Sequence, residues 1–399
     1  MKTFLEDAWS ASGREYEEFA EMIDFIVSAT FAVPFDLSRL ELLTPYQNDE
    51  EGNIHFYVDS GERMQQGLPS GSCMMRRSVI ESIGAEELAA EMERHGVAFR
   101  LNGKFFFSLH GIARDLGARA LLQGDGIYQS THERNRFLAS LYGKGKTGAV
   151  AIFRADEKMN KLISLGSKNY TYIPQSLILS VIETLSDPSI LGEFEMVHWF
   201  MDHNITQCVI KFPHRAEDMA RMYGRTDLPM PCMLIESSDS GDCSFTATPL
   251  WQLTGGSYVR GEGEFSRKHY GSVTPEGILK DIAERTWSTY TKLPERLCEL
   301  ALIDAPDPKA VVEWVFTDPT LKLADAVGKR VVDAVCEAVC MEFVPGVKYT
   351  LMDIVLILMG VPARLDLTEN RKKAMETALY KCAFRPLEEI PSVITLMPT

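Results

Sequence analysis

The sequence lacks the segments that export a protein or hold it in a membrane. Its opening stretch, MKTFLEDAWSASGREYEEFAEM, is acidic and broken by polar side chains, so it has no apolar core of a signal peptide. No run of about 18 uncharged apolar residues occurs, which excludes a membrane-spanning helix. The most apolar stretch, residues 351–361, is short and contains Asp353. We therefore expect a cytoplasmic protein without a membrane partner.

Cysteine spacing typical of a disulfide framework or a zinc site is also missing. The eight cysteines are scattered along a long chain, which favours reduced thiols in a cytosolic protein. Cys336 and Cys340 stand four residues apart on a predicted helix and could share a face. A zinc site would need further Cys or His ligands close by, so small core residues are the favoured interpretation.

Motifs for catalysis are incomplete. The segment 140–148, SLYGKGKTG, has Ser140 where a nucleotide-binding Walker A loop needs glycine, and a predicted helix precedes it instead of a strand. It is interpreted as a flexible basic loop that could wrap a phosphate backbone or as a plain solvated turn. His198, Asp202 and His203 could form a hydrolytic metal site, but few carboxylates stand near them. We predict no catalytic residue, no metal and no cofactor, and keep a metal-dependent hydrolase as a second alternative.

Charge is distributed unevenly along the chain. With 41 basic and 56 acidic side chains, the formal net charge is −15, which argues against a uniformly basic nucleic-acid binder and against adsorption to anionic membranes. Residues 1–99 carry 7 basic and 19 acidic side chains, whereas residues 100–175 carry 12 and 5. The net charges of the four successive regions are −12, +7, −6 and −4. A basic segment therefore lies within an acidic protein.

The hydrophobic patterns predict an α+β fold, with a central antiparallel sheet flanked by N- and C-terminal helices. We expect an acidic, mainly helical region 1–99, an α+β core 100–275 containing the basic segment, and a helical region 276–399. Predicted helices are a first one carrying Tyr16, Phe19, Ile23, Ile26 and Val27, then 85–95, 131–142, 175–185, 276–290, 307–316, 321–343 and 368–383; predicted strands are 54–58, 104–109, 149–154, 206–212, 232–236 and 244–248.

Cations and aromatic rings are interleaved in and beyond the basic segment. Cations follow phosphates and aromatic faces stack on bases, which is what sequence-tolerant binding of a single strand requires. Arg267 and Lys268 add a second basic cluster after the predicted sheet. The candidate nucleic-acid contacts are Arg134, Arg136, Tyr142, Lys144, Lys146, Lys168, Tyr170, Tyr172, Arg267 and Lys268.

Three segments, 167–175 (SKNYTYIPQ), 238–248 and 265–271 (FSRKHYG), together with the closing stretch 349–367, resemble blocks of a phage- and plasmid-borne family catalogued as domain of unknown function 932. The blocks span about half of the chain, and none is placed in residues 1–100. The resemblance implies an origin in a phage or plasmid, and hence a bacterial host cell, but it brings no established catalytic residues.

The leading hypothesis is a non-enzymatic, oligomeric protein that binds single-stranded nucleic acid as an accessory of DNA replication or recombination. A self-assembling structural or host-interaction protein is the alternative. In that case the basic segment would dock onto the acidic region of a neighbouring subunit, and charges of −12 and +7 are complementary in this sense.

Overall fold

A computed structural model describes the greater part of the chain. The described residues are 9–35, 40–43, 53–59, 72–76, 97–100, 149–155, 160–167, 170–203, 205–238, 243–269, 274–390 and 393. The predicted helices 85–95 and 131–142 and the predicted strand 104–109 lie outside them.

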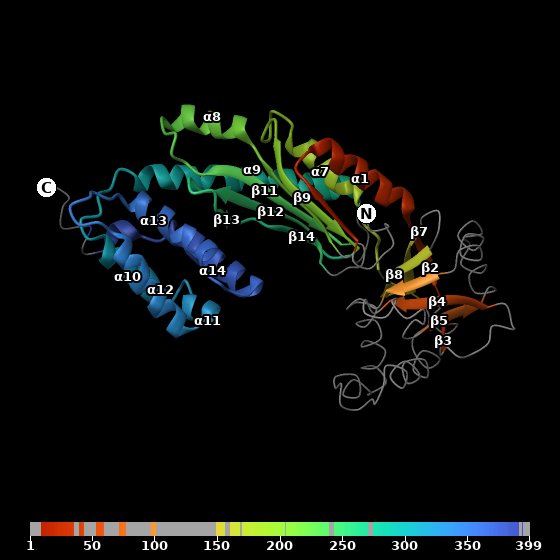
Figure 1. Ribbon diagram of the computed structural model, residues 1–399. Coiled ribbons are helices and arrows are strands. Elements are labelled where there is room, and N and C mark those ends of the chain that lie inside the picture. Colours follow the sequence, from red (N-terminus) through yellow and green to blue (C-terminus); the bar gives the residue numbers. More distant parts are fainter. Residues whose placement is uncertain are drawn as a thin grey trace.

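The fold is α+β, and its centre is an antiparallel sheet, called here the central sheet (Figure 1). The strand order is β1-β9-β10-β11-β12-β13, and β14 also pairs with β12. The strands are β1 (Ser10–Gly13), β9 (Glu195–Asp202), β10 (Thr206–Lys211), β11 (Met230–Ser237), β12 (Phe245–Gln252), β13 (Tyr258–Arg260) and β14 (Phe265–Arg267). The predicted strands 206–212, 232–236 and 244–248 are confirmed as β10, β11 and β12.

One face of the central sheet is covered by helices that complete the core. These are α1 (Tyr16–Ala29), α7 (Ser176–Leu185) and α9 (Pro275–Leu300). Phe19, Ile23 and Ile26 of α1 are fully buried in one hydrophobic cluster with the sheet, as the helical spacing of these residues predicts. Alternate residues of β10, such as Cys208 and Ile210, belong to the same cluster.

The C-terminal third is helical and packs onto α9 and the β13 side of the sheet. The helices are α10 (Pro308–Thr317), α11 (Leu323–Val327), α12 (Lys329–Glu342), α13 (Leu351–Gly360) and α14 (Glu369–Cys382). The predictions 276–290, 307–316 and 368–383 are confirmed as α9, which extends further, α10 and α14. The single predicted helix 321–343 is wrong. Gly328 has a φ of +93°, which ends α11 and starts α12 in a new direction.

A second sheet has the order β2-β7-β8-β6-β4-β5-β3 and is mixed, because β6 runs parallel to both β4 and β8. Its strands are β2 (Thr30–Phe35), β3 (Leu40–Leu43), β4 (Asn53–Asp59), β5 (Ser72–Arg76), β6 (Val97–Arg100), β7 (Ala149–Ala155) and β8 (Asn160–Ser167). The predicted strands 54–58 and 149–154 are confirmed as β4 and β7. The described residues of region 1–99, which was expected to be mainly helical, form β1 to β6 besides α1.

Two short 3-10 helices, η3 (Val361–Arg364) and η4 (Leu387–Glu389), flank α14. None of the described helices has the length and apolar character needed to span a bilayer.

Candidate functional site

The candidate nucleic-acid contacts fall into two groups. Arg134, Arg136, Tyr142, Lys144, Lys146 and Lys168 lie outside the described residues. Tyr170, Tyr172, Arg267 and Lys268 are described, and the two pairs come from segments that are far apart in the sequence.

The fold brings Tyr170 and the Arg267–Lys268 pair together through His269. The rings of Tyr170 and His269 stack with centroids 5.0 Å apart and planes inclined by 3°. The Thr171 N–H donates to the His269 carbonyl at 2.9 Å. Nδ1 of His269 lies 3.1 Å from the Thr171 carbonyl oxygen, which only accepts, so Nδ1 carries a proton. Arg267 and Lys268 are exposed immediately before this histidine, and Tyr170 is partly exposed.

Tyr172 differs from Tyr170 in its surroundings. The Tyr172 hydroxyl oxygen is fully buried, although the residue as a whole is partly exposed. A ring whose polar tip points inward presents less of its face to a base.

The three segments that carry the family resemblance converge at one end of the central sheet. The register pairs Phe245, at the start of β12, with Arg267, at the end of β14, and His269 then contacts Thr171. β11 ends at the same place, with Ser237 one residue beyond the Glu236–Thr246 pair. We call this place the polar end of the central sheet, and Figure 1 shows β7 and β8 beside it.

Buried polar side chains gather at the polar end. Between 0% and 5% of the surface of each residue is exposed, so the polar groups have lost their contacts with solvent. Burying polar groups costs free energy unless hydrogen bonds replace those to water, so such a gathering needs a reason. The residues are Arg154, Gln175, His203, Thr206, Ser237, Ser238 and His269.

Strand alternation puts two of these side chains into the core layer. Thr206 continues the inward row of Cys208 and Ile210, and Ser237 continues the row of Met233 and Ile235. Thr206 and Ser237 are also directly paired in the β10–β11 register. The last layer of an apolar core is thus built from hydroxyl groups.

Arg154 of β7 reaches the polar end from the second sheet. Its Nη1 lies 3.0 Å from Nδ1 of His203, which stands in the turn between β9 and β10. A guanidinium only donates, so Nδ1 accepts and the imidazole is neutral with its proton on Nε2. The ring of Trp9 lies against His203, with centroids 5.4 Å apart.

The geometry gives no support to the metal-site alternative at His198, Asp202 and His203. His198 is exposed on β9, whereas His203 is buried and accepts from Arg154. An Asp202 carboxylate oxygen accepts the Ile205 N–H at 2.8 Å and closes the turn. Partial desolvation of the ring and the neighbouring Arg14 hold the pKa of His198 below its usual value. In the part of the chain that is described, no group of three or more His, Cys, Asp or Glu side chains could hold a metal ion.

The described cysteines are free thiols, and Cys208, Cys232 and Cys382 are buried. Cys336 and Cys340 share a face of α12, as predicted, and lie against the core. Burial and the adjacent Cys340 raise the pKa of Cys336 to about 12, so its thiolate is scarce at neutral pH.

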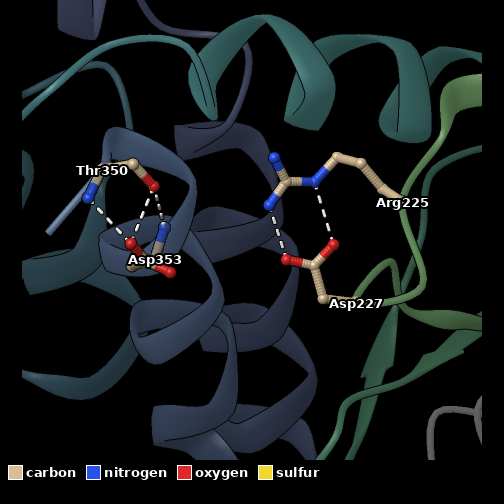
Figure 2. A network of polar contacts seen from close by, with 4 residues as sticks. All are labelled: Arg225, Asp227, Thr350 and Asp353. Carbon is tan, nitrogen blue, oxygen red and sulfur yellow. Dashed lines mark hydrogen bonds and ion pairs between the residues drawn. The ribbon is translucent and has the colours of Figure 1, made fainter.

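A second polar network lies at the opposite end of β11 and stabilises the fold (Figure 2). Arg225 forms a two-pronged pair with Asp227, with Nε–Oδ1 and Nη2–Oδ2 distances of 2.9 and 2.6 Å. Hydrogen bonds from Arg225 lower the pKa of Asp227. Thr350 and Asp353 close a capping box at the start of α13. Each of these four residues has its hydrogen-bond partner within the chain.

No family model, curated protein or solved structure matches this chain. The resemblance to domain of unknown function 932 therefore rests on the quoted segments alone.

The buried residues of the polar end were not among the predicted contacts. Their signal in the sequence is a polar residue at the next alternate position of a buried strand, as in Thr206-x-Cys208-x-Ile210. That signal indicates a polar layer at the end of the core, but it does not predict which strands are neighbours there.

Proposed function

We propose that this chain is a non-enzymatic, oligomeric protein of phage or plasmid origin that binds single-stranded nucleic acid. The observation that carries the proposal is the Tyr170–His269 stack beside the exposed Arg267–Lys268 pair. An aromatic platform next to two cations is the arrangement that accepts a base and its flanking phosphates.

The charge of the flanking chain supports the same ligand. Residues 100–175, which include Tyr170, carry a net charge of +7. The net charge of −15 disfavours non-specific adsorption of nucleic acid elsewhere on the surface. Binding would therefore be confined to the basic segment and the adjoining stack.

A fluorescence-anisotropy titration with a labelled single-stranded oligonucleotide tests the proposal at about 50 mM and about 200 mM salt. Binding should weaken steeply as salt rises, because each neutralised phosphate releases counterions. Absence of binding at low salt, or an affinity that does not depend on salt concentration, would contradict the proposal.

The Arg267→Ala/Lys268→Ala double variant should weaken binding and reduce the salt slope by about 1.4, which is the value for two lost single-strand phosphate contacts. The matched control is Lys329→Ala/Arg330→Ala, which removes an exposed, adjacent basic pair from α12. Equal losses of affinity in the two double variants would show that overall charge, and not the position beside the stack, determines binding.

Tyr170→Ala should cost about 1–3 kcal/mol of binding free energy through lost stacking, whereas Tyr170→Phe should retain it. Equal loss in both variants would exclude Tyr170 as a stacking platform.

Measuring the oligomer mass by light scattering in the same salt series distinguishes the self-assembly alternative from nucleic-acid binding. Docking of the basic segment onto an acidic region of a neighbour predicts a mass that falls with salt and no binding of the oligonucleotide. An oligomer whose mass is unchanged while the oligonucleotide binds supports the proposal.

A further inference from the structure

Three oxygen atoms at the polar end are buried, and none finds a hydrogen-bond partner within the described part of the chain. They are Oε1 of Gln175, Oγ1 of Thr206 and Oγ of Ser237. Gln175 is 1% exposed, and the other two residues are 0% exposed. Each such atom costs about 1–3 kcal/mol when it is left unpaired, so the three atoms call for a hydrogen-bond partner from outside the chain, a water molecule or a ligand.

The fold places the three side chains together. Thr206 and Ser237 are cross-strand partners, and both point to the side of the sheet that α7 covers. Gln175 is the residue at which α7 begins. Thr171, four residues earlier, is bonded to His269 at the polar end.

The direction of α7 follows from a contact beyond its far end. Beyond the far end of the helix, the Glu193 carboxylate lies 3.0 Å from Nε2 of His214, in the first turn of α8 (Pro213–Tyr223). α8 follows the last residue of β10, so α7 runs from the start of β10, at Thr206, towards its end. α7 also packs directly against β11.

The chemistry of this place favours an oxyanion. The N-terminus of α7 carries the positive end of the helix dipole, and no acidic residue in its first turn offsets it. The hydroxyl groups of Thr206 and Ser237 can donate. The carboxamide of Gln175 can turn its NH₂ group to the same point, because its oxygen and nitrogen can exchange places.

The carboxylates nearest in sequence do not compete for this place. Asp202 is held by the Ile205 N–H. Glu236 lies one residue from Ser237 and therefore on the other face of the sheet, where the Thr246 hydroxyl is 3.4 Å from its Oε2.

We propose that Gln175, Thr206 and Ser237 form a buried site for a phosphate group at the N-terminus of α7. The inference is independent of the proposed function, since the phosphate can be free or can terminate a nucleic acid.

Thermal unfolding with inorganic phosphate, compared with chloride at equal ionic strength, tests the site in the full-length protein. Phosphate should raise Tm saturably, because a ligand that binds only the native state stabilises it. Thr206→Val and Ser237→Ala should each weaken phosphate binding by about tenfold through the loss of one donor.

The two site variants need not unfold the protein, which keeps the test decisive. Without phosphate, removing an unpaired buried hydroxyl should leave Tm unchanged or raise it. Ser186→Ala is the matched control, because Ser186 donates to Ile182 O at 2.7 Å at the other end of α7. It should lower Tm slightly and leave the phosphate effect intact.

A phosphate effect that is absent in the wild type, or that persists unchanged in both site variants, overturns the inference. Comparing the binding of oligonucleotides with and without a 5′-phosphate identifies the source of the bound phosphate group. Tighter binding of the phosphorylated strand, lost in Ser237→Ala, identifies a nucleic-acid terminus. Equal binding of the two strands, with phosphate still raising Tm, identifies a free phosphate compound and leaves the nucleic-acid proposal to its own titration.

Discussion

Arg154 and His203 connect the two sheets through a hydrogen bond of 3.0 Å that is closed to solvent. The residues are 49 positions apart, and one lies on a strand of the second sheet while the other lies in a turn of the central sheet. The bond requires a neutral imidazole, since the guanidinium supplies the proton. The contact is therefore a specific junction between the sheets, at the edge of the candidate site.

Replacing His203 by Leu should destabilise the protein by about 2 kcal/mol, because the buried guanidinium of Arg154 loses its hydrogen bond to Nδ1. His203→Gln should lose less, since the carboxamide oxygen can accept in place of Nδ1. Urea unfolding of the two variants measures the difference. A Leu variant as stable as the wild type would show that the junction contributes nothing to stability.

Much of the central fold was predictable because local pattern and tertiary role agree there. β10 and β11 alternate their buried rows, and α1 presents its apolar residues at helical spacing. β1, with the sequence Ser-Ala-Ser-Gly, has no such pattern. Its place is set by packing, because a Cβ at Gly13 would lie 2.8 Å from the indole of Trp199. α13 is apolar on most sides, so periodicity could not separate a buried helix from a strand.

The candidate site was predictable only in its exposed part. Tyr170, Arg267 and Lys268 carry a recognisable chemistry, but His269 joins them across 98 residues by pairing that no local pattern encodes. Thr206 and Ser237 have the composition of ordinary strand ends. Their meaning arises from the register that sets them side by side at the end of the core layer.

Asp318 should make the free energy of unfolding depend on pH in the acidic range. Burial opposes its ionisation, but hydrogen bonds from Thr320 and Arg385 outweigh burial and hold its pKa below the usual value. The unfolded chain then binds a proton more readily than the native protein does. The contribution of Asp318 to the free energy of unfolding is therefore complete above the ordinary carboxyl pKa of 3.8, and it is lost as pH falls through the lowered pKa of the native state.

Asp318→Asn should therefore be less stable than the wild type at pH 7, by about 1–2 kcal/mol, and this difference should shrink in acid. Arg385→Gln removes the partner whose Nε lies 2.9 Å from Oδ2 of Asp318, and it should flatten the same part of the pH profile. Urea unfolding between neutral and acidic pH measures both variants. A deficit that stays constant with pH would show that Asp318 does not titrate with folding.

Gly263 is required for two separable reasons. Its φ is +87°, and a Cβ there would lie 2.5 Å from Oγ1 of Thr289, a hydroxyl already directed to the Glu262 and Arg285 carbonyls at 3.0 and 3.1 Å. Gly263→Ala should cost about 3 kcal/mol from backbone strain and overpacking together. Gly346→Ala is the control for strain alone, because φ is +83° and nothing lies within 4 Å of its Cβ position. It should cost about 1–2 kcal/mol in the same unfolding assay. Equal costs would remove the steric part of the explanation.

Thr350 should stabilise α13 through its side chain, whereas Thr368, at the same position before α14, should not. In the capping box, Thr350 Oγ1 accepts the Asp353 N–H at 3.3 Å, and the Asp353 carboxylate accepts the Thr350 N–H at 2.8 Å (Figure 2). Thr368 makes no side-chain capping bond. Thr350→Ala should therefore lower the free energy of unfolding by about 1 kcal/mol, and Thr368→Ala by a few tenths at most. Because the substitution and the helix position are the same, the difference isolates the capping bond. Equal losses would show that α13 is held by its buried apolar side chains alone.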